Sequence, residues 1–210
     1  TYAYPPQFNS ANLSIRSFVN RGPEKVIGSR DGLFYINEAT GIVKSFVKPV
    51  LTSDLILTIC FYEGEYYIGT YGGGMMVLNP QTSSLKYFTQ GDTELFQKGH
   101  IFCVKPDNRG NLWIGTSQGL FCYNGQTKQI KNFTSTNSQL PEGNVYEVSF
   151  DSTGKGWIAT ETGMCIYDPA SQSLRSNVFP EGFVHKDKVR TIYEDAEHNL
   201  YFIREKGSLF

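Results

Sequence analysis

The residues of this sequence most suited to chemistry are three histidines and four cysteines among 210 residues. His100, His185 and His198 are too far apart in sequence to form the paired-histidine motif of a zinc site. No two cysteines have the two-residue gap of a zinc knuckle, and a free cysteine packs as a small hydrophobic residue. We therefore predict no metal site, and we expect single buried thiols in strands at Cys60, Cys103, Cys122 and Cys165.

Acidic residues and glycines suggest three other kinds of site, and each pattern is incomplete. The aspartate turns "PDNRGN" and "FDSTGK" lack the alternating aspartates and the distal glutamate of a calcium loop. The segment "YGGGMM" lacks the Gly-Lys-Ser/Thr of a phosphate-binding loop and precedes a strand. A glycosidase-like carboxylate pair would have to come from residues whose spacing favours turn and surface positions: Glu142, Glu147, Asp151 and Glu161. The sequence predicts no catalytic residue and no cofactor.

Composition and charge narrow the class of protein. The 19 basic and 20 acidic residues nearly cancel, which gives no electrostatic footprint for nucleic acid or an anionic membrane. Abundant glycine, tyrosine and phenylalanine are typical of strands and turns. No apolar run approaches the roughly 18 residues of a membrane span. Because the chain begins at "TYAYPPQFNS" and stops inside the apolar run of "KGSLF", we expect a mature or excised fragment of a longer protein.

One phrase, exemplified by "WIGTSQGLFCYN", recurs along the chain. A glycine follows its first apolar run each time, and these glycines are separated by 41, 46, 44 and 44 residues. A period of this length indicates propeller blades or solenoid turns. The glycines that we align, each expected to take a positive φ in a hairpin turn, are Gly32, Gly73, Gly119, Gly163 and Gly207.

Each repeat reads as strand, polar turn, strand, glycine turn, strand, longer turn, strand. Four short strands in about 44 residues form an antiparallel meander, and no segment has helical periodicity. We therefore predict an all-β fold: a β-propeller fragment of four complete four-stranded antiparallel blades and part of a fifth. Trp113, Trp157 and Tyr67 occupy equivalent positions, and we expect them to be wedged between adjacent blades.

The phrase "D-x-x-G-x-L-W-I-G-T-x-x-G-L-x-x-Y" resembles the two-component regulator propeller repeat over roughly residues 13–210. The third unit carries it with Asp107, Gly110, Leu112, Trp113, Ile114, Gly115, Thr116, Gly119, Leu120 and Tyr123. The fourth unit carries it with Asp151, Gly154, Trp157, Ile158, Thr160, Gly163 and Tyr167. The fourth unit has Ala159 in place of Gly115, and the last unit has Ile203 and Arg204 where glycine and threonine are expected. The first unit lacks the aspartate. The last unit has His198 at the position of Gly110, and histidine tolerates a left-handed backbone better than most residues.

The resemblance implies the periplasmic sensor region of a hybrid two-component regulator of the Bacteroides type, many of which sense glycans. Such proteins also carry a membrane helix, a histidine kinase, a receiver and a DNA-binding domain, so the kinase activity would belong to the full-length protein. The blades we expect are residues 13–50, 51–92, 97–136, 141–181 and an incomplete 186–210. Residues 1–12 would be an N-terminal extension or the outer strand of a preceding blade.

Ligands of propellers bind near the mouth of the central channel, where the loops between the second and third strands meet the loops that enter the first strand. These loops vary between units while the frame stays constant, as expected of recognition loops on a scaffold. Tyr71, with its charged and amide neighbours, suits an oligosaccharide. The candidate ligand-binding residues are Arg30, Asp31, Tyr71, His100, Ser117, Gln118, Asn144, Glu161 and Lys186.

The function that we predict is non-catalytic sensing of glycan-derived oligosaccharides outside the cytoplasm. Two alternatives stay open: a propeller-type lyase or hydrolase, and a pure protein–protein interaction scaffold. A partial propeller leaves two blade faces and a strand edge uncovered, so we also expect self-association and contacts with the remaining blades of a longer protein. We expect no nucleic-acid partner and no membrane contact for this fragment.

Overall fold

The computed structural model describes residues 14–91, 93–176 and 187–205, which form antiparallel sheets and one short helix. The first two sheets comprise β1 (Ile15–Arg21), β2 (Glu24–Ser29), β3 (Leu33–Asn37), β4 (Ile42–Phe46), β5 (Ile56–Tyr62), β6 (Glu65–Thr70), β7 (Met75–Asn79) and β8 (Ser84–Tyr87). The helix α1 (Thr93–Lys98) follows. The other sheets comprise β9 (Ile101–Pro106), β10 (Asn111–Thr116), β11 (Gly119–Asn124), β12 (Ile130–Phe133), β13 (Val145–Phe150), β14 (Gly156–Thr160), β15 (Gly163–Asp168), β16 (Ser173–Arg175), β17 (Val189–Glu194) and β18 (Leu200–Arg204).

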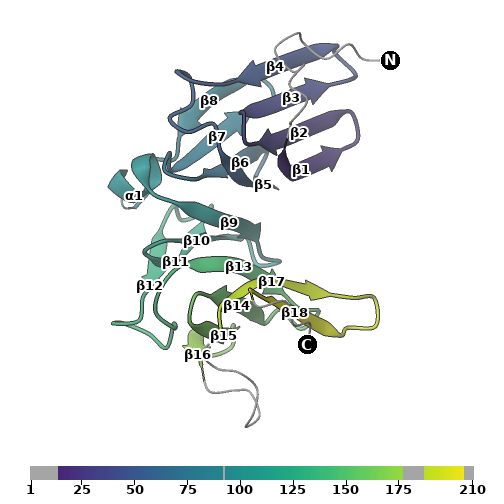
Figure 1. Cartoon of the computed structure of the whole chain (residues 1–210). Coiled ribbons are helices and arrows are strands. Elements are labelled where there is room, and N and C mark those ends of the chain that lie inside the picture. Colours follow the sequence, from purple (N-terminus) through teal and green to yellow (C-terminus); the bar gives the residue numbers. More distant parts are fainter. Residues whose placement is uncertain (1–13, 92, 177–186, 206–210) are drawn as a thin grey trace.

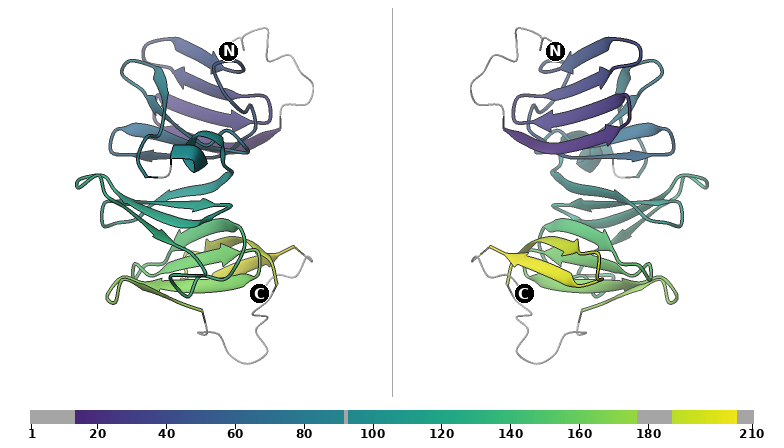
Figure 2. Two further views of the ribbon diagram at one scale, coloured as in Figure 1. Left: turned by 90° about the vertical axis from the view of Figure 1, so that its left-hand side faces the viewer. Right: turned by 90° about the vertical axis from the view of Figure 1, so that its right-hand side faces the viewer.

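The sheets are propeller blades that follow one another in chain order (Figure 1). Blades 1 to 4 each have four strands in the order of the sequence, and β17 and β18 form the described part of blade 5. The first strand of each blade contacts the first strand of the next, from β1 and β5 to β13 and β17. The first strands are therefore innermost, and the side views in Figure 2 show the blades fanned along one arc. The predicted propeller fragment with a fifth, incomplete blade is confirmed.

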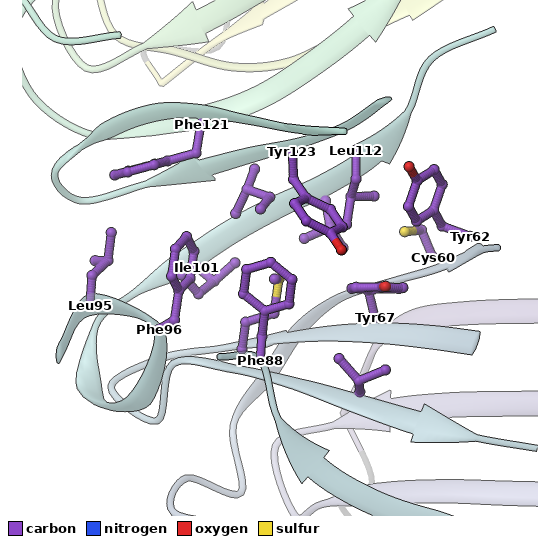
Figure 3. Packing of buried hydrophobic residues seen from close by; sticks show 14 residues of the cluster. Cys60, Tyr62, Tyr67, Phe88, Leu95, Phe96, Ile101, Leu112, Phe121 and Tyr123 are labelled. Carbon is purple, nitrogen blue, oxygen red and sulfur yellow. The ribbon is translucent and has the colours of Figure 1, made fainter. Parts of the chain in front are cut away.

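The hydrophobic core consists of the layers between neighbouring blades. Between blades 2 and 3, Tyr67 and Phe88 meet Leu112, Phe121 and Tyr123 (Figure 3). Fully burying a large apolar side chain contributes about 1.5–3 kcal/mol, so each layer contributes substantially to the stability of the fold. Since a blade has apolar residues on both faces, each blade depends on its neighbours for burial.

The glycine of "WIGT" is a consequence of this close packing. A Cβ atom at Gly115 would lie 2.5 Å from the Sγ atom of Cys103 and 2.8 Å from the backbone oxygen of Val145 in blade 4. Glycine at this position lets the innermost strands of blades 3 and 4 approach one another. In blade 4 the equivalent residue is the fully buried Ala159, which packs against Val189 of blade 5.

Trp113 is wedged between blades, as predicted. It is 1% exposed, and its ring contacts Phe150 and Tyr167 of blade 4 at centroid distances of 5.9 and 4.5 Å. Its Nε1–H donates to Oδ2 of Asp107 at 2.9 Å, and Trp157 donates to Asp151 in the same way. The repeated aspartate therefore fixes the indole of the strand that follows its turn.

Asp151 is also bound by its own turn. Its Oδ1 accepts from the backbone N–H of Thr153 at 2.9 Å and of Lys155 at 3.0 Å. Burial alone would raise the pKa of Asp151, but the hydrogen bonds from Thr153, Trp157 and the turn outweigh it, and the pKa is lowered. In blade 5, Asp195 and Tyr201 repeat the bond at 2.9 Å, and His198 takes a φ of +65°, which confirms its predicted left-handed backbone.

Asp151→Asn is expected to lower the free energy of unfolding at pH 7 by about 1–3 kcal/mol, because an amide offers one acceptor where the carboxylate offers two. The folded-state pKa of Asp151 lies below the unfolded value of 3.8, so the contribution is present above pH 3.8 and is lost as the pH falls through the folded pKa. Urea unfolding at pH 7 and pH 3 measures the difference. Asp31→Asn, at an exposed residue, is the control; an equal loss at both pH values would contradict the prediction.

The alignment of the turn glycines needs one correction, in blade 2. Gly119 has the predicted positive φ, +119°, and its carbonyl oxygen accepts from the hydroxyl of Thr116. In blade 2 the equivalent bond runs from the hydroxyl of Thr70 to the carbonyl oxygen of Gly74, at 2.9 Å, and Gly74 has a φ of +72°. The equivalent residue is thus Gly74 rather than Gly73, because this turn has one extra residue.

Gly74 lies beside α1, a helix too short to be detected from sequence periodicity. The N–H of Gly74 donates to the carbonyl oxygen of Gly99, just after the helix, at 3.0 Å. Phe96 of α1 is fully buried and contacts Phe88 and Phe121 at 5.0 and 5.4 Å. The helix therefore closes one end of the layer between blades 2 and 3 (Figure 3).

Gly74→Ala is expected to destabilise the protein more than Gly64→Ala. Both glycines have left-handed backbones, with φ of +72° and +86°, which costs a non-glycine residue about 1–2 kcal/mol. A Cβ atom at Gly74 would also overlap the backbone of Phe96, whereas nothing lies within 4 Å of one at Gly64. We expect an additional loss of about 1–3 kcal/mol for Gly74→Ala, measured by urea unfolding. Equal losses in the two variants would refute the close contact.

The cysteines are single thiols in strands, as predicted. Cys60, Cys103 and Cys165 are buried, and Cys122 is half-buried. Burial raises the pKa of Cys60 and of Cys122 to about 12, so both stay protonated at neutral pH. The turn at Gly207 and residues 1–12 lie outside the described residues, as does His185.

Candidate functional site

One end of every blade repeats the same backbone contact. The loop after the second strand donates an N–H to a carbonyl oxygen of the segment that enters the first strand. We call the surface formed by these ends of the blades the mouth face. The five bonds, 2.9 to 3.2 Å long, join Arg30 to Ser14, Tyr71 to Leu55, Ser117 to His100, Glu161 to Asn144 and Glu205 to Lys188.

A β-bulge recurs at the same height in each blade, just inside the mouth face. In every first strand the pairing with the second strand skips one residue; in β9, for example, Ile101 and Cys103 are paired while Phe102 is not. A bulge redirects the side chain of its unpaired residue away from the regular alternation. The five unpaired residues are Arg16, Leu57, Phe102, Tyr146 and Arg190.

Three of the bulge residues join two mouth-face residues in a row of four rings that ends at a guanidinium group. We call this row the mouth strip; it comprises Tyr71, His100, Phe102, Tyr146 and Arg190. Tyr71 stacks on His100 across blades 2 and 3, with ring centroids 4.0 Å apart and an interplanar angle of 25°. His100 lies 6.1 Å from Phe102, which lies 5.1 Å from Tyr146 of blade 4. The Cζ atom of Arg190 in blade 5 lies 4.4 Å from the ring centroid of Tyr146. The strip thus crosses four blades.

The mouth strip has one exposed ring and one buried nitrogen atom without a partner among the described residues. Half of the Tyr71 side chain is exposed, which leaves a ring face for contact with an apolar surface. Nδ1 of His100 is buried and has no hydrogen-bond partner among the described residues. Buried polar atoms without a partner are rare in folded proteins and cost free energy.

A charge-balanced network borders the mouth strip. Lys188 contacts Glu161 at 3.7 Å and Glu205 at 3.3 Å, and Arg190 contacts Glu205 at 2.7 Å. Arg190 and then Lys188 lower the pKa of Glu205, and the Tyr146 hydroxyl followed by Glu205 raises the pKa of Lys188. Two cations therefore face two carboxylates.

The structure brings some of the predicted ligand residues together. Tyr71 stacks on His100, and the amide of Asn144 donates to Glu161 at 2.9 Å. Arg30, Asp31 and Gln118 are exposed in their loops, and Ser117 is half-buried. Lys186 lies outside the described residues.

Phe102, Tyr146, Lys188 and Arg190 were missed by the sequence analysis. Phe102 and Tyr146 read as ordinary strand residues, because a bulge depends on the pairing of two strands and not on one strand's composition. One signal was present: each directly follows the first apolar residue of its innermost strand, in "IFCV" and "VYEV".

Of the four acidic residues considered for a glycosidase pair, Asp151 and Glu161 lie far apart and Glu147 is engaged by a cation. Asp151 precedes β14 and Glu161 follows it, so these two lie at opposite ends of that strand. Glu147, on β13, forms an ion pair with Lys105 at 3.5 Å. In the described part of the chain, no group of three or more His, Cys, Asp or Glu residues is arranged to hold a metal ion. Among the same residues, no helix is long and apolar enough to cross a bilayer.

Solved structures with this fold include extracellular domains of two-component system proteins. The Two component regulator propeller family matches residues 96–118. The chain is similar to the extracellular domain of the putative hybrid two component system BT3049 from B. thetaiotaomicron, with 21% identity and a TM-score of 0.76 over 98% of this chain. It is also similar to that of BT4673 from the same organism, with 19% identity and a TM-score of 0.75 over 98% of this chain. These findings confirm the predicted resemblance.

The chain covers only 30% and 28% of those two extracellular domains, so it spans less than a third of their length. A computationally designed protein, Ika4, shares the fold at a TM-score of 0.56 and 13% identity, over 76% of this chain and 93% of its own. No curated protein sequence gives a significant match.

Proposed function

We propose that this chain is a non-catalytic segment of the periplasmic sensor of a hybrid two-component signalling protein, and that the mouth strip binds a glycan-derived oligosaccharide. The observation that carries the proposal is the row of rings from Tyr71 to Tyr146 across neighbouring blades. The matching propeller family and the extracellular neighbours support the sensor role. Histidine kinase activity would belong to another part of the full-length protein.

The chemistry of the mouth strip suits a neutral sugar. A pyranose ring has an apolar face and a rim of hydroxyl groups. The exposed ring of Tyr71 offers an apolar contact, and the bordering amide of Asn144 and carboxylate of Glu161 offer hydrogen bonds. Because Lys188 and Arg190 are neutralised by Glu161 and Glu205, the site carries no strong preference for an anion.

Ligand binding would signal through the packing of the sensor. A ligand that contacts residues from blades 2 to 5 favours the arrangement of blades in which all its contacts are made. It shifts the equilibrium between two arrangements only by its difference in affinity for them. The change would then be passed to a kinase through the membrane.

Tyr71→Ala is expected to raise the Kd for a neutral oligosaccharide roughly tenfold, because loss of a central aromatic contact costs about 1–2 kcal/mol. Calorimetry with a panel of neutral tetrasaccharides identifies the ligand and measures the Kd. Tyr193→Ala removes a similarly exposed tyrosine from blade 5, outside the strip, and is expected to leave the Kd unchanged.

Three outcomes would overturn this proposal. Equal Kd values for wild type and Tyr71→Ala would exclude the mouth strip as the site. No binding by any member of the panel would favour the interaction scaffold. Release of reducing ends from the panel would favour the enzyme.

We also propose that the two end blades are association surfaces. Phe18 of blade 1 is 53% exposed, and Tyr193 and Ile203 of blade 5 are 63% and 45% exposed. Thr191 pairs with Ile203 and Tyr193 with Tyr201, so the two exposed residues lie on one face of blade 5. Inside the arc the equivalent faces are covered by another blade. In the full-length protein further blades would cover these surfaces, and in the isolated chain a second copy would do so.

Sedimentation at micromolar concentration is expected to show self-association of the isolated chain. Phe18→Asp combined with Ile203→Asp is expected to shift it to a monomer, since charges on both end faces oppose burial. Tyr71→Asp, at an equally exposed aromatic residue on the mouth strip, is the control and should still associate. A clean wild-type monomer at these concentrations would rule the proposal out.

A further inference from the structure

A groove runs between the outer strands of blades 3 and 4, away from the mouth strip. It comprises two hollows of about 490 Å³ each, which adjoin one another at Lys131, Phe133 and Gln172. Each hollow falls within the range of small-molecule sites, about 300–1,000 Å³. We call this the blade 3–4 groove; its other charged and amide residues are Arg109, Asn111, Asn124, Gln129, Asn132, Asn137, Gln139 and Arg175.

Lys131 lies where the two hollows join, and its position on the outer strand is occupied by a cation in each complete blade. In blade 3, Lys131 pairs with Cys122 of the third strand, three residues after the turn glycine. The equivalent register pairs Lys44 with Tyr35, Lys86 with Val77 and Arg175 with Ile166.

In blades 2 and 4 this cation is neutralised within its own blade. Lys86 contacts Glu65 at 3.6 Å, and Arg175 contacts Asp168 at 3.6 Å. Glu65 is the first residue of the second strand, and Asp168 is the last residue of the third.

Blade 3 has asparagine at both of these positions. Asn111 begins β10 and Asn124 ends β11, and the amide of Asn124 donates to Asn111 Oδ1 at 2.9 Å. Among the described residues Lys131 forms no ion pair; its Nζ lies 3.5 Å from the carbonyl oxygen of Gln172 and 4.7 Å from the ring centroid of Phe133. The blade 3–4 groove therefore presents a cation that the neighbouring blades neutralise.

The other charges at the groove favour an anion as well. Arg109 lines one hollow and forms no ion pair with any described residue, and no carboxylate lines either hollow. Two acidic residues adjacent in sequence to the lining are engaged elsewhere: Asp107 accepts from Trp113 and its own turn, and Asp168 contacts Arg175. The exposed amides of Gln129, Asn132 and Gln172 add hydrogen-bonding groups along its length.

We propose that the blade 3–4 groove is a second ligand site, which binds an acidic oligosaccharide carrying carboxylate or sulfate groups. The extended shape suits a chain of sugar units, the amides suit hydroxyl groups, and Lys131 and Arg109 supply charge-assisted hydrogen bonds to the acidic groups. Only the choice of a saccharide rests on the proposed sensor function; the charge and position of the site rest on the groove itself.

The experiment is calorimetry of the whole chain, at low and physiological salt, with three tetrasaccharides: an oligogalacturonide, a chondroitin sulfate fragment and neutral cellotetraose. We expect the groove to bind an acidic tetrasaccharide, and the first two probes distinguish carboxylate from sulfate recognition. Lys131→Ala should raise the Kd for the acidic probe roughly tenfold. Lys86→Ala, which removes the same charge from the equivalent position of blade 2, should leave it within about twofold.

Two further variants test the groove without removing packing. Asn124→Asp gives blade 3 the carboxylate of blade 4, and Asn111→Glu gives it that of blade 2; each should weaken binding of the acidic probe as Lys131→Ala does. Tyr71→Ala, on the mouth strip, should leave that binding unchanged, so failure of the groove and failure of the mouth strip are distinguishable.

The inference would be overturned if neither acidic tetrasaccharide bound, or if Lys86→Ala weakened binding as much as Lys131→Ala. It would also be overturned if the two asparagine variants bound the acidic probe like the wild type.

Discussion

A four-stranded blade of this chain has apolar residues on both faces, and it can bury them only between two other blades. This constraint governs the rest of the structure. It places Trp113 between blades 3 and 4 and requires a small residue at Gly115, where the next innermost strand approaches. It also explains why the exposed Phe18, Tyr193 and Ile203 lie on the two end blades. The stability of each blade and its association with other blades therefore depend on the same apolar faces.

The repeat was readable from the sequence because its signals are local. A strand, an aspartate turn and a glycine turn each occupy a few adjacent residues, so the period, the blade order and the roles of Trp113 and Gly119 could be predicted. The turn glycine of blade 2 was misaligned because the turn has an extra residue before Gly74, and each of three consecutive glycines fits the pattern equally well. The helix α1 was missed because six residues show no helical period.

The binding surfaces were harder to predict because they depend on pairs of distant residues. Tyr71 and His100 were both predicted at the mouth face, but their stacking depends on the contact between two blades. The positions of the Phe102 and Tyr146 side chains in the mouth strip depend on bulges in the strand pairing. The roles of Asn111 and Asn124 are visible only when the register of blade 3 is compared with those of blades 2 and 4. The two surfaces differ in charge: the mouth strip is balanced, and the blade 3–4 groove carries cations that form no ion pair with the described part of the chain.

The recurring bulge has a consequence for how such a protein can change over evolutionary time. The residue in each bulge is outside the regular pairing of its strand, so its side chain is less constrained by the core than its neighbours are. The five positions already hold two arginines, a leucine, a phenylalanine and a tyrosine on an otherwise similar frame. Duplication and drift of blades can therefore vary these positions one at a time while the architecture is inherited intact. Selection for a new ligand would act on a few independent substitutions and would not require a new fold.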